Sequence, residues 1–166
     1  PSREQWSDIL QRPTKSFNDI ENTVKEIFRE VQKKGDEAVA KYTSIFDGIT
    51  FENIQVATEE IIEAEALVSD DLKKAIQVAQ ANILKFHVAQ KTENIEVVTT
   101  QGVLCWQEKR PIQKVGLYIP GGTAPLFSTV LMLAIPAQLA GCNEIILCSP
   151  PDNSGKINPA ILYTAT

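Results

Sequence analysis

One stretch constrains the fold more than any other, Val115–Pro151, with the sequence VGLYIPGGTAPLFSTVLMLAIPAQLAGCNEIILCSPP. Residues 115–119 form a short apolar run with β-favouring side chains, and Pro120-Gly121-Gly122 ends it. Apolar residues then recur at helical spacing over Phe127–Ala137, and Glu144–Cys148 is a second apolar run. The order strand, glycine-rich turn, helix, strand predicts a right-handed βαβ unit with parallel strands.

The helix of this unit carries its own start and stop signals. Thr123 is a predicted N-cap, Pro125 is expected in the first turn, and Gly141 is expected to end the helix. Pro136 lies inside the helix and predicts a kink or a break, because proline removes one backbone hydrogen bond.

The same stretch is almost free of charge. Between Val115 and Ser149 the only charged side chain is Glu144, although 22% of the chain is charged. Such a segment is expected to be covered on nearly all sides, as the strands of a parallel sheet are. A membrane span is excluded because prolines and glycines keep every apolar run well below the ~20 residues that a spanning helix needs.

The N-terminal third is predicted to be helical after a loose leader at Pro1–Pro13. Ser16 is expected to cap a helix that Gly35 ends, and Asp36 to cap a shorter helix that closes at Asp47-Gly48. The first of these helices carries an apolar stripe, made by Phe17, Ile20, Val24, Ile27, Phe28 and Val31.

The middle of the chain predicts a short strand, two more helices and a hairpin. The strand is expected at Ile54–Ala57, a glutamate-rich helix from Thr58, and a further helix capped by Ser69. Ile95–Thr99 and Val103–Glu108 then flank a Thr-Gln-Gly turn, which indicates a β-hairpin.

The C-terminal end predicts one more helix, since Asn158 and Pro159 form an N-cap and first-position pair. That helix is only about two turns long at Thr166, and a single βαβ unit makes a thin sheet. The sequence is therefore expected to be a piece of a longer protein.

Composition narrows the class of protein. A net charge of −5 argues against nucleic acid and anionic membranes as partners. No basic start followed by an apolar core is visible at the N-terminus, so no signal peptide is expected. Cys105, Cys142 and Cys148 lie in apolar runs, which predicts buried free thiols in a reducing cytoplasm.

Several segments resemble the N-terminal part of the histidinol dehydrogenase family. They are VGLYIPGGTAPLFSTVLMLAIPAQLAGC, GDEAVAKYTSIFDG, NILKFHVAQ and GVLCWQEKRPIQ. Together they cover nearly the whole chain, but only about the first two-fifths of that family's length. More loosely, the strand–Ile-Pro–helix–strand order looks like the start of the cofactor domain of aldehyde dehydrogenases, a superfamily to which the family's fold is related.

The resemblance implies an NAD- and zinc-dependent enzyme that oxidises L-histidinol to L-histidine through histidinal, in the cytoplasm and as a homodimer. The tyrosine of its VGLYIPGG motif contacts NAD, which makes Tyr118 the implied cofactor-binding residue here. The zinc ligands and the acid–base pair of the family fall beyond Thr166. The chain alone is therefore expected to hold neither catalytic residues nor metal ligands, and to be inactive.

The residues themselves leave other interpretations open. The Gly121-Gly122 turn favours a plain strand-to-helix connection over a phosphate site, since it lacks the Gly-x-Gly-x-x-Gly spacing. His87, the only histidine, favours a structural hydrogen bond over a catalytic role. Cys105 and Cys148, considered as nucleophiles, lack a cationic neighbour and favour inert thiols. The acidic helix faces (Glu59, Glu60, Glu63, Glu65) favour solvated surfaces over metal ligands.

The prediction is an α/β fold, with a helical region over residues 1–92 and a β-hairpin plus a partial Rossmann-like βαβ sheet over residues 93–166. The predicted function is the N-terminal portion of an L-histidinol dehydrogenase. Two alternatives remain: a related NAD-dependent dehydrogenase of another small alcohol or aldehyde, and a non-catalytic folding or dimerisation module.

Overall fold

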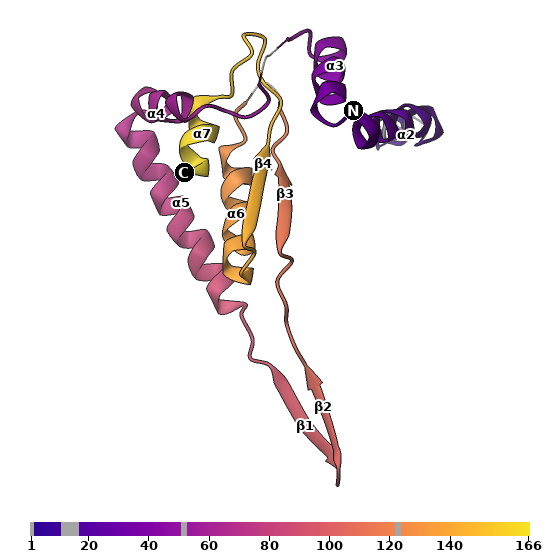
Figure 1. The fold of residues 1–166 in the computed structure, drawn as a ribbon, viewed down its shortest axis with the longest axis vertical. Helices are drawn as coiled ribbons and strands as arrows, with labels where there is room; N and C mark the ends of the chain where they lie inside the picture. The colour runs from indigo at the N-terminus through magenta and orange to yellow at the C-terminus, as the bar shows by residue number, and fades with distance from the viewer. Residues whose placement is uncertain (1, 11–16, 51–52, 122–123) are drawn as a thin grey trace. The chain divides into compact units, whose positions relative to one another are not determined.

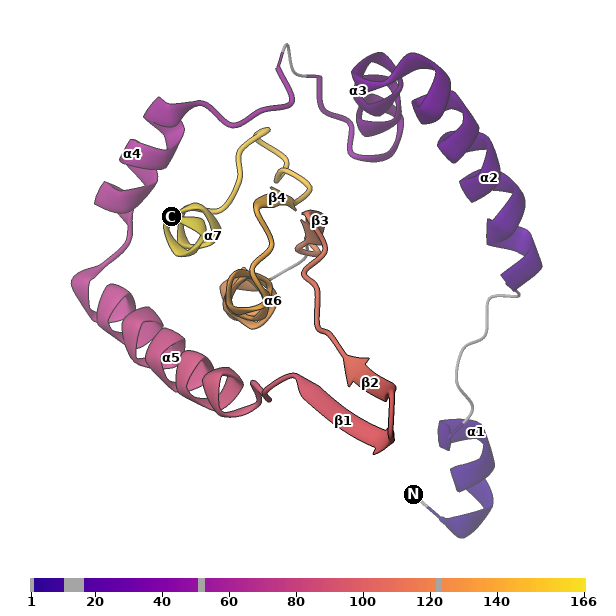
Figure 2. The same cartoon turned by 60° about the horizontal axis from the view of Figure 1, so that its bottom comes forward.

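The chain forms two compact units, one at Pro1–Ile54 and the other at Gln55–Thr166. The structure, a computed structural model, describes residues 2–10, 17–50, 53–121 and 124–166. Figure 1 shows the elements in order along the chain, and Figure 2 shows them turned by 60°. The boundary expected between residues 92 and 93 lies inside the second unit, and as a domain boundary it stays a prediction.

The first unit is helical. It contains a 3-10 turn at Arg3–Gln5 and helices α1 (Trp6–Leu10), α2 (Phe17–Lys34) and α3 (Asp36–Phe46). The loose leader predicted at the N-terminus is therefore wrong for Arg3–Leu10, which are helical; the Ser16 cap lies outside the described residues. Asp36 is the first residue of α3 rather than its cap, because Gly35 is the N-cap at φ 58.

The apolar stripe of α2 is only partly covered. Ile27 and Val31 are half-buried, but Phe28 is 72% exposed and Ile20 and Val24 are also exposed. Among the side chains of the first unit that the structure describes, the best-buried apolar one is Ala38 of α3. The sequence pattern correctly predicts an amphipathic helix, but most of its apolar face lies open in this unit.

The second unit begins with two helices, α4 (Thr58–Leu67) and α5 (Asp70–Ala89). The short strand expected at Ile54–Ala57 is not formed, because a strand needs a neighbour to pair with and this segment instead leads directly into the start of α4. The Ser69 cap is confirmed: its Oγ accepts a hydrogen bond from the Leu72 amide at 3.3 Å.

The predicted hairpin is confirmed as β1 (Ile95–Thr100) and β2 (Val103–Gln107), paired antiparallel. Every residue from 91 to 114 is exposed, so the apolar side chains on both of its faces are uncovered in this chain.

The predicted βαβ unit is confirmed. Strands β3 (Lys114–Tyr118) and β4 (Glu144–Cys148) pair in parallel, and α6 (Phe127–Ala140) connects them. The pair opens with Lys114 opposite Glu144, whose side chains form an ion pair at 2.7 Å.

Two details of the predicted helix differ. Pro125 precedes α6 instead of lying in its first turn, and the helix is not broken at Pro136, where a kink stays a prediction. The Thr123 cap lies outside the described residues, whereas Gly141 ends the helix as expected, in the left-handed conformation at φ 87.

Helix α6 lies between α5 and the strands β3 and β4 of the second unit (Figures 1 and 2). Apolar clusters form on two of its sides. Toward the sheet, Val130 packs with Ile119 and with Ile161 of α7 (Pro159–Ala165). Toward α5, Leu131 and Ile135 pack against Ile76. A helix with apolar contacts on several sides needs an apolar sequence nearly all round, which explains why this stretch carries no charge.

Helix α7 completes the unit. Its predicted cap is confirmed, since Asn158 Oδ1 accepts a hydrogen bond from the Ala160 amide at 2.9 Å and Pro159 takes the first helical position. The part of the chain that the structure describes contains no helix long and apolar enough to cross a membrane.

Candidate functional site

The candidate site lies where β3 and β4 end side by side. Strand residues alternate between two faces, and one face of this pair is covered by α6 while the other is open. Val115, Leu117, Ile145 and Leu147 lie toward the covered face and are partly buried; Gly116, Tyr118, Ile146 and Cys148 lie on the open face and are exposed. Ligands of open α/β sheets bind at this edge, outside the carboxyl ends of the strands.

Tyr118 is the last residue of β3 and is 62% exposed. It stands opposite Cys148 in the strand register, and both belong to the open face. The residue after it, Ile119, is completely buried, and its amide donates to the Cys148 carbonyl at 2.8 Å. A firmly anchored backbone therefore presents an exposed aromatic ring at the carboxyl end of the strand.

The cysteines differ from the prediction. Cys105 and Cys148 are exposed and Cys142 is half-buried; all three are free thiols. The expectation of buried thiols is wrong for the two strand cysteines because period-two alternation puts Cys148 on the open face of its sheet, and the hairpin that holds Cys105 is exposed on both faces.

The loop after β4 is ordered by one carboxylate. Asp152 accepts hydrogen bonds from the Ser154 hydroxyl at 2.6 Å, the Ser154 amide at 2.8 Å and the Lys156 amide at 3.1 Å. The hydrogen bond from the Ser154 side chain is the main cause that lowers the pKa of Asp152. The loop that borders the carboxyl end of β4 is thus held by its own turn.

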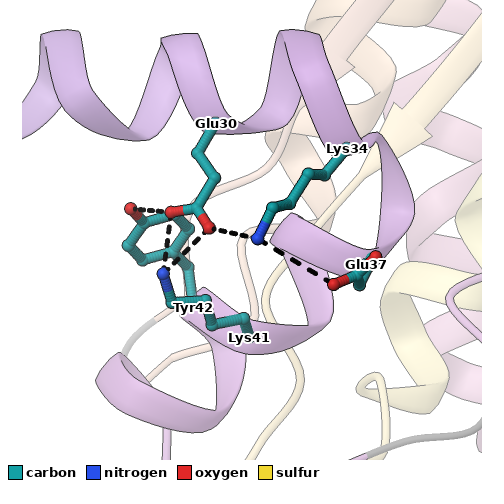
Figure 3. A network of polar contacts seen from close by, with 5 residues as sticks. All are labelled: Glu30, Lys34, Glu37, Lys41 and Tyr42. Carbon is teal, nitrogen blue, oxygen red and sulfur yellow. Dashed lines mark hydrogen bonds and ion pairs between the residues drawn. The ribbon is translucent and has the colours of Figure 1, made fainter.

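A second polar cluster lies in the first unit, where Glu30 of α2 faces α3 (Figure 3). Its carboxylate accepts hydrogen bonds from the Lys41 ammonium at 2.7 and 2.9 Å, the Tyr42 hydroxyl at 2.7 Å and the Lys34 ammonium at 3.1 Å. These bonds, led by the one from Lys41, lower the pKa of Glu30 to about 2. The bond to Glu30 raises the pKa of Tyr42 to about 12.

The Glu30 cluster joins two helices and does not have the features of a reaction site. Each charged group already has a partner, Lys41 lies over the Tyr42 ring at 4.9 Å, and Phe46 stacks on that ring at 5.8 Å. Nothing in the sequence pattern of either helix alone predicts it, because its members come from two helices joined at Gly35.

Two of the other candidates, His87 and Glu60, make local hydrogen bonds within or beside their own helices. His87 is half-buried, and its Nδ1 lies 2.7 Å from Gln90 Oε1 within hydrogen-bonding distance, in accord with the structural interpretation. Glu60 Oε1 accepts from the Ala57 amide at 3.1 Å at the start of α4. Within residues 2–10, 17–50, 53–121 and 124–166, no three His, Cys, Asp or Glu residues converge as a metal site would require.

Comparison with known proteins decides the family. The family model described as histidinol dehydrogenase matches residues 10–166. The chain belongs to the histidinol dehydrogenase family.

Individual relatives agree with this. The chain is 53% identical over 165 residues to a histidinol dehydrogenase of Bacteroides thetaiotaomicron, covering 99% of this chain and 39% of that protein. It is 49% identical over 163 residues to the histidinol dehydrogenase of Escherichia coli K12, covering 98% of this chain and 37% of that protein. A crystal structure of histidinol dehydrogenase from Elizabethkingia anophelis matches with a TM-score of 0.88 and 53% identity, over 99% of this chain and 38% of that one.

The chain thus spans about two-fifths of the length of these relatives, and it corresponds to their N-terminal region. The resemblance of four sequence segments correctly predicts the family. Sequence reasoning missed the Glu30 cluster and the close approach of Gly121 to Pro150 at the sheet edge.

Proposed function

We propose that this chain is the N-terminal part of an NAD- and zinc-dependent L-histidinol dehydrogenase, an oxidoreductase of histidine biosynthesis. Family membership carries the proposal, since the family model covers residues 10–166 and the sequence identity to named relatives reaches 53%. In this proposal the intact enzyme is a cytoplasmic homodimer and belongs with the aldehyde dehydrogenase-like fold. The chain contributes scaffold and one cofactor contact, Tyr118.

The open face of β3 and β4 suits one end of a dinucleotide. Tyr118 offers a flat, exposed ring and a hydroxyl at the edge where α/β proteins bind cofactors. Helix α6 begins after the same edge, and its N-cap Leu126 has no side-chain oxygen to occupy the amides of the first turn. Such amides favour an anionic group such as a phosphate. NAD supplies the hydride acceptor, and this chain's part is to bind and orient it.

Zinc does not fit the residues present. The described part of the chain brings no three ligand side chains together, and a zinc site needs converging nitrogen, sulfur or oxygen donors. We therefore assign the zinc ligands and the acid–base pair to the remainder of the enzyme, and this chain alone is expected not to oxidise histidinol.

The test is Tyr118→Phe in the full-length enzyme that carries this segment. Loss of one hydrogen bond typically costs ~0.5–1.5 kcal/mol, so the NAD KM should rise about two- to tenfold. The histidinol KM and the zinc content should stay nearly unchanged.

Tyr163→Phe is the matched control, because Tyr163 packs partly buried beside the cluster that joins α5 and α6. It should leave the NAD KM unchanged. If Tyr118→Phe and Tyr118→Ala both lower thermal stability without changing NAD kinetics, Tyr118 is a structural residue and the cofactor contact is refuted.

A further inference from the structure

The two strands at the candidate site stop pairing abruptly. Their last backbone hydrogen bond runs from the Ile119 amide to the Cys148 carbonyl, at 2.8 Å. Pro120 directly follows Ile119 in the first segment, and Pro150 and Pro151 follow Ser149 in the second. Because proline has no N–H, Pro120, Pro150 and Pro151 donate no further ladder hydrogen bonds, and the packing of the two segments against each other becomes the contact to consider.

The packing contact is between Gly121 and Pro150. A Cβ atom built on Gly121 would lie 2.7 Å from Pro150 Cγ, 3.7 Å from its Cβ and 3.8 Å from its Cδ. The proline ring is closed onto its own backbone, so Cγ can move only by a change of ring pucker and not by rotation about side-chain bonds, as the end of a long side chain would. At Gly116 in β3, by contrast, an added Cβ would meet nothing within 4 Å. Glycine is needed at position 121 for space.

We propose that Gly121 is a positioning residue for the cofactor contact: its close approach to Pro150 fixes the turn after Tyr118 against the loop after β4. This inference rests on the proposed function. Tyr118 and Gly121 are separated only by Ile119 and Pro120, so a displacement of Gly121 moves the turn that directly follows the cofactor-binding end of β3.

The geometry sets the size of the effect. Restoring an ordinary 3.4 Å contact from 2.7 Å requires a displacement of about 0.7 Å at the turn or the loop. Misplacement of a binding group by about 1 Å can cost up to ~100-fold in rate, so an intermediate effect on cofactor binding is expected.

A double-variant cycle in the full-length enzyme tests the proposal, with Gly121→Ala, Pro150→Ala and the combined variant. Pro150→Ala removes Cγ and Cδ, which leaves the new Cβ 3.7 Å from the Cβ of residue 150, an ordinary contact. Gly121→Ala should raise the NAD KM about three- to thirtyfold and the histidinol KM less than about twofold. The combined variant should return to within about threefold of Pro150→Ala alone.

The proposal is overturned if Gly121→Ala keeps the parental NAD KM, if both Michaelis constants rise together, or if the combined variant keeps the full defect. Should Gly121→Ala fail to fold, the combined variant decides: a soluble protein with a restored NAD KM supports the proposal, and an insoluble one refutes it. Failure of the proposed function is seen separately, because only then do the Tyr118 variants leave the NAD KM unchanged.

Discussion

Leu131 offers the sharpest test of how the second unit is held together. The side chain is 4% exposed and lies in the cluster that joins α6 to α5, beside Ile76 and Ile135. Leu131→Ala removes three buried carbon atoms. Since burial of each contributes about 0.8 kcal/mol, the lost hydrophobic free energy is about 2.4 kcal/mol. The unfilled cavity adds to this, so the free energy of unfolding should fall by ~2–5 kcal/mol.

Urea unfolding followed by far-UV circular dichroism measures this loss. With a denaturant slope of about 2 kcal/mol per molar, the midpoint should fall by roughly 1–2.5 M. Leu67→Ala is the matched control: Leu67 belongs to the same unit but is 71% exposed, so its loss should cost less than about 1 kcal/mol. Equal midpoints for the two variants would refute the assignment of Leu131 to the core between α5 and α6.

Three further predictions concern the Glu30 cluster, a helix cap and metal binding. Since the folded-state pKa of Glu30 is about 2 against an ordinary 4.5, its contribution to stability is present above about pH 4.5 and lost as the pH falls through about 2. Acid titration followed by helical circular dichroism should show this loss of stability, and Glu30→Gln should abolish it. The same variant should lower the pKa of Tyr42 from about 12 toward 10, which ultraviolet absorbance of the phenolate measures. Asn158→Ala should lower the free energy of unfolding by ~0.5–2 kcal/mol, as measured by urea unfolding. The control Asn153→Ala, at an exposed loop residue, should lower it by less than ~0.5 kcal/mol, and similar losses in the two variants would contradict the role of Asn158 as a helix cap. Protein purified without chelator should contain far less than one zinc per chain, and a stoichiometric content would contradict the ligand assignment.

Local signals predicted much of this fold. The caps at Ser69 and Asn158 and the stop at Gly141 formed as expected. Each depends on hydrogen bonds or backbone conformations within a few residues, and the side chain that makes them is visible in the sequence. The hairpin at Ile95–Gln107 formed for the same reason, because its turn and its strands are neighbours.

Predictions from the sequence failed where the structure or burial of a segment depends on a partner that is distant along the chain. The apolar run at Ile54–Ala57 is compatible with a strand, but no strand forms without a neighbour. Cys148 lies in an apolar strand, yet its exposure depends on which face of the sheet α6 covers. Apolar sequence predicts the tendency to be buried, whereas only the packing of other elements supplies the cover.

The sequence by itself determined the family and the βαβ unit, and its resemblance to that family is the source of the proposal that Tyr118 contacts the cofactor. The tertiary structure decided which groups meet. Gly121 and Pro150 are far apart along the chain, and the parallel pairing of β3 with β4 brings them into contact. Glu30 meets Lys41 and Tyr42 because the turn at Gly35 folds α3 back onto α2. Glycine and glutamate are chemically unremarkable in a sequence, and they acquire these roles only when the fold fixes a neighbour at a given distance.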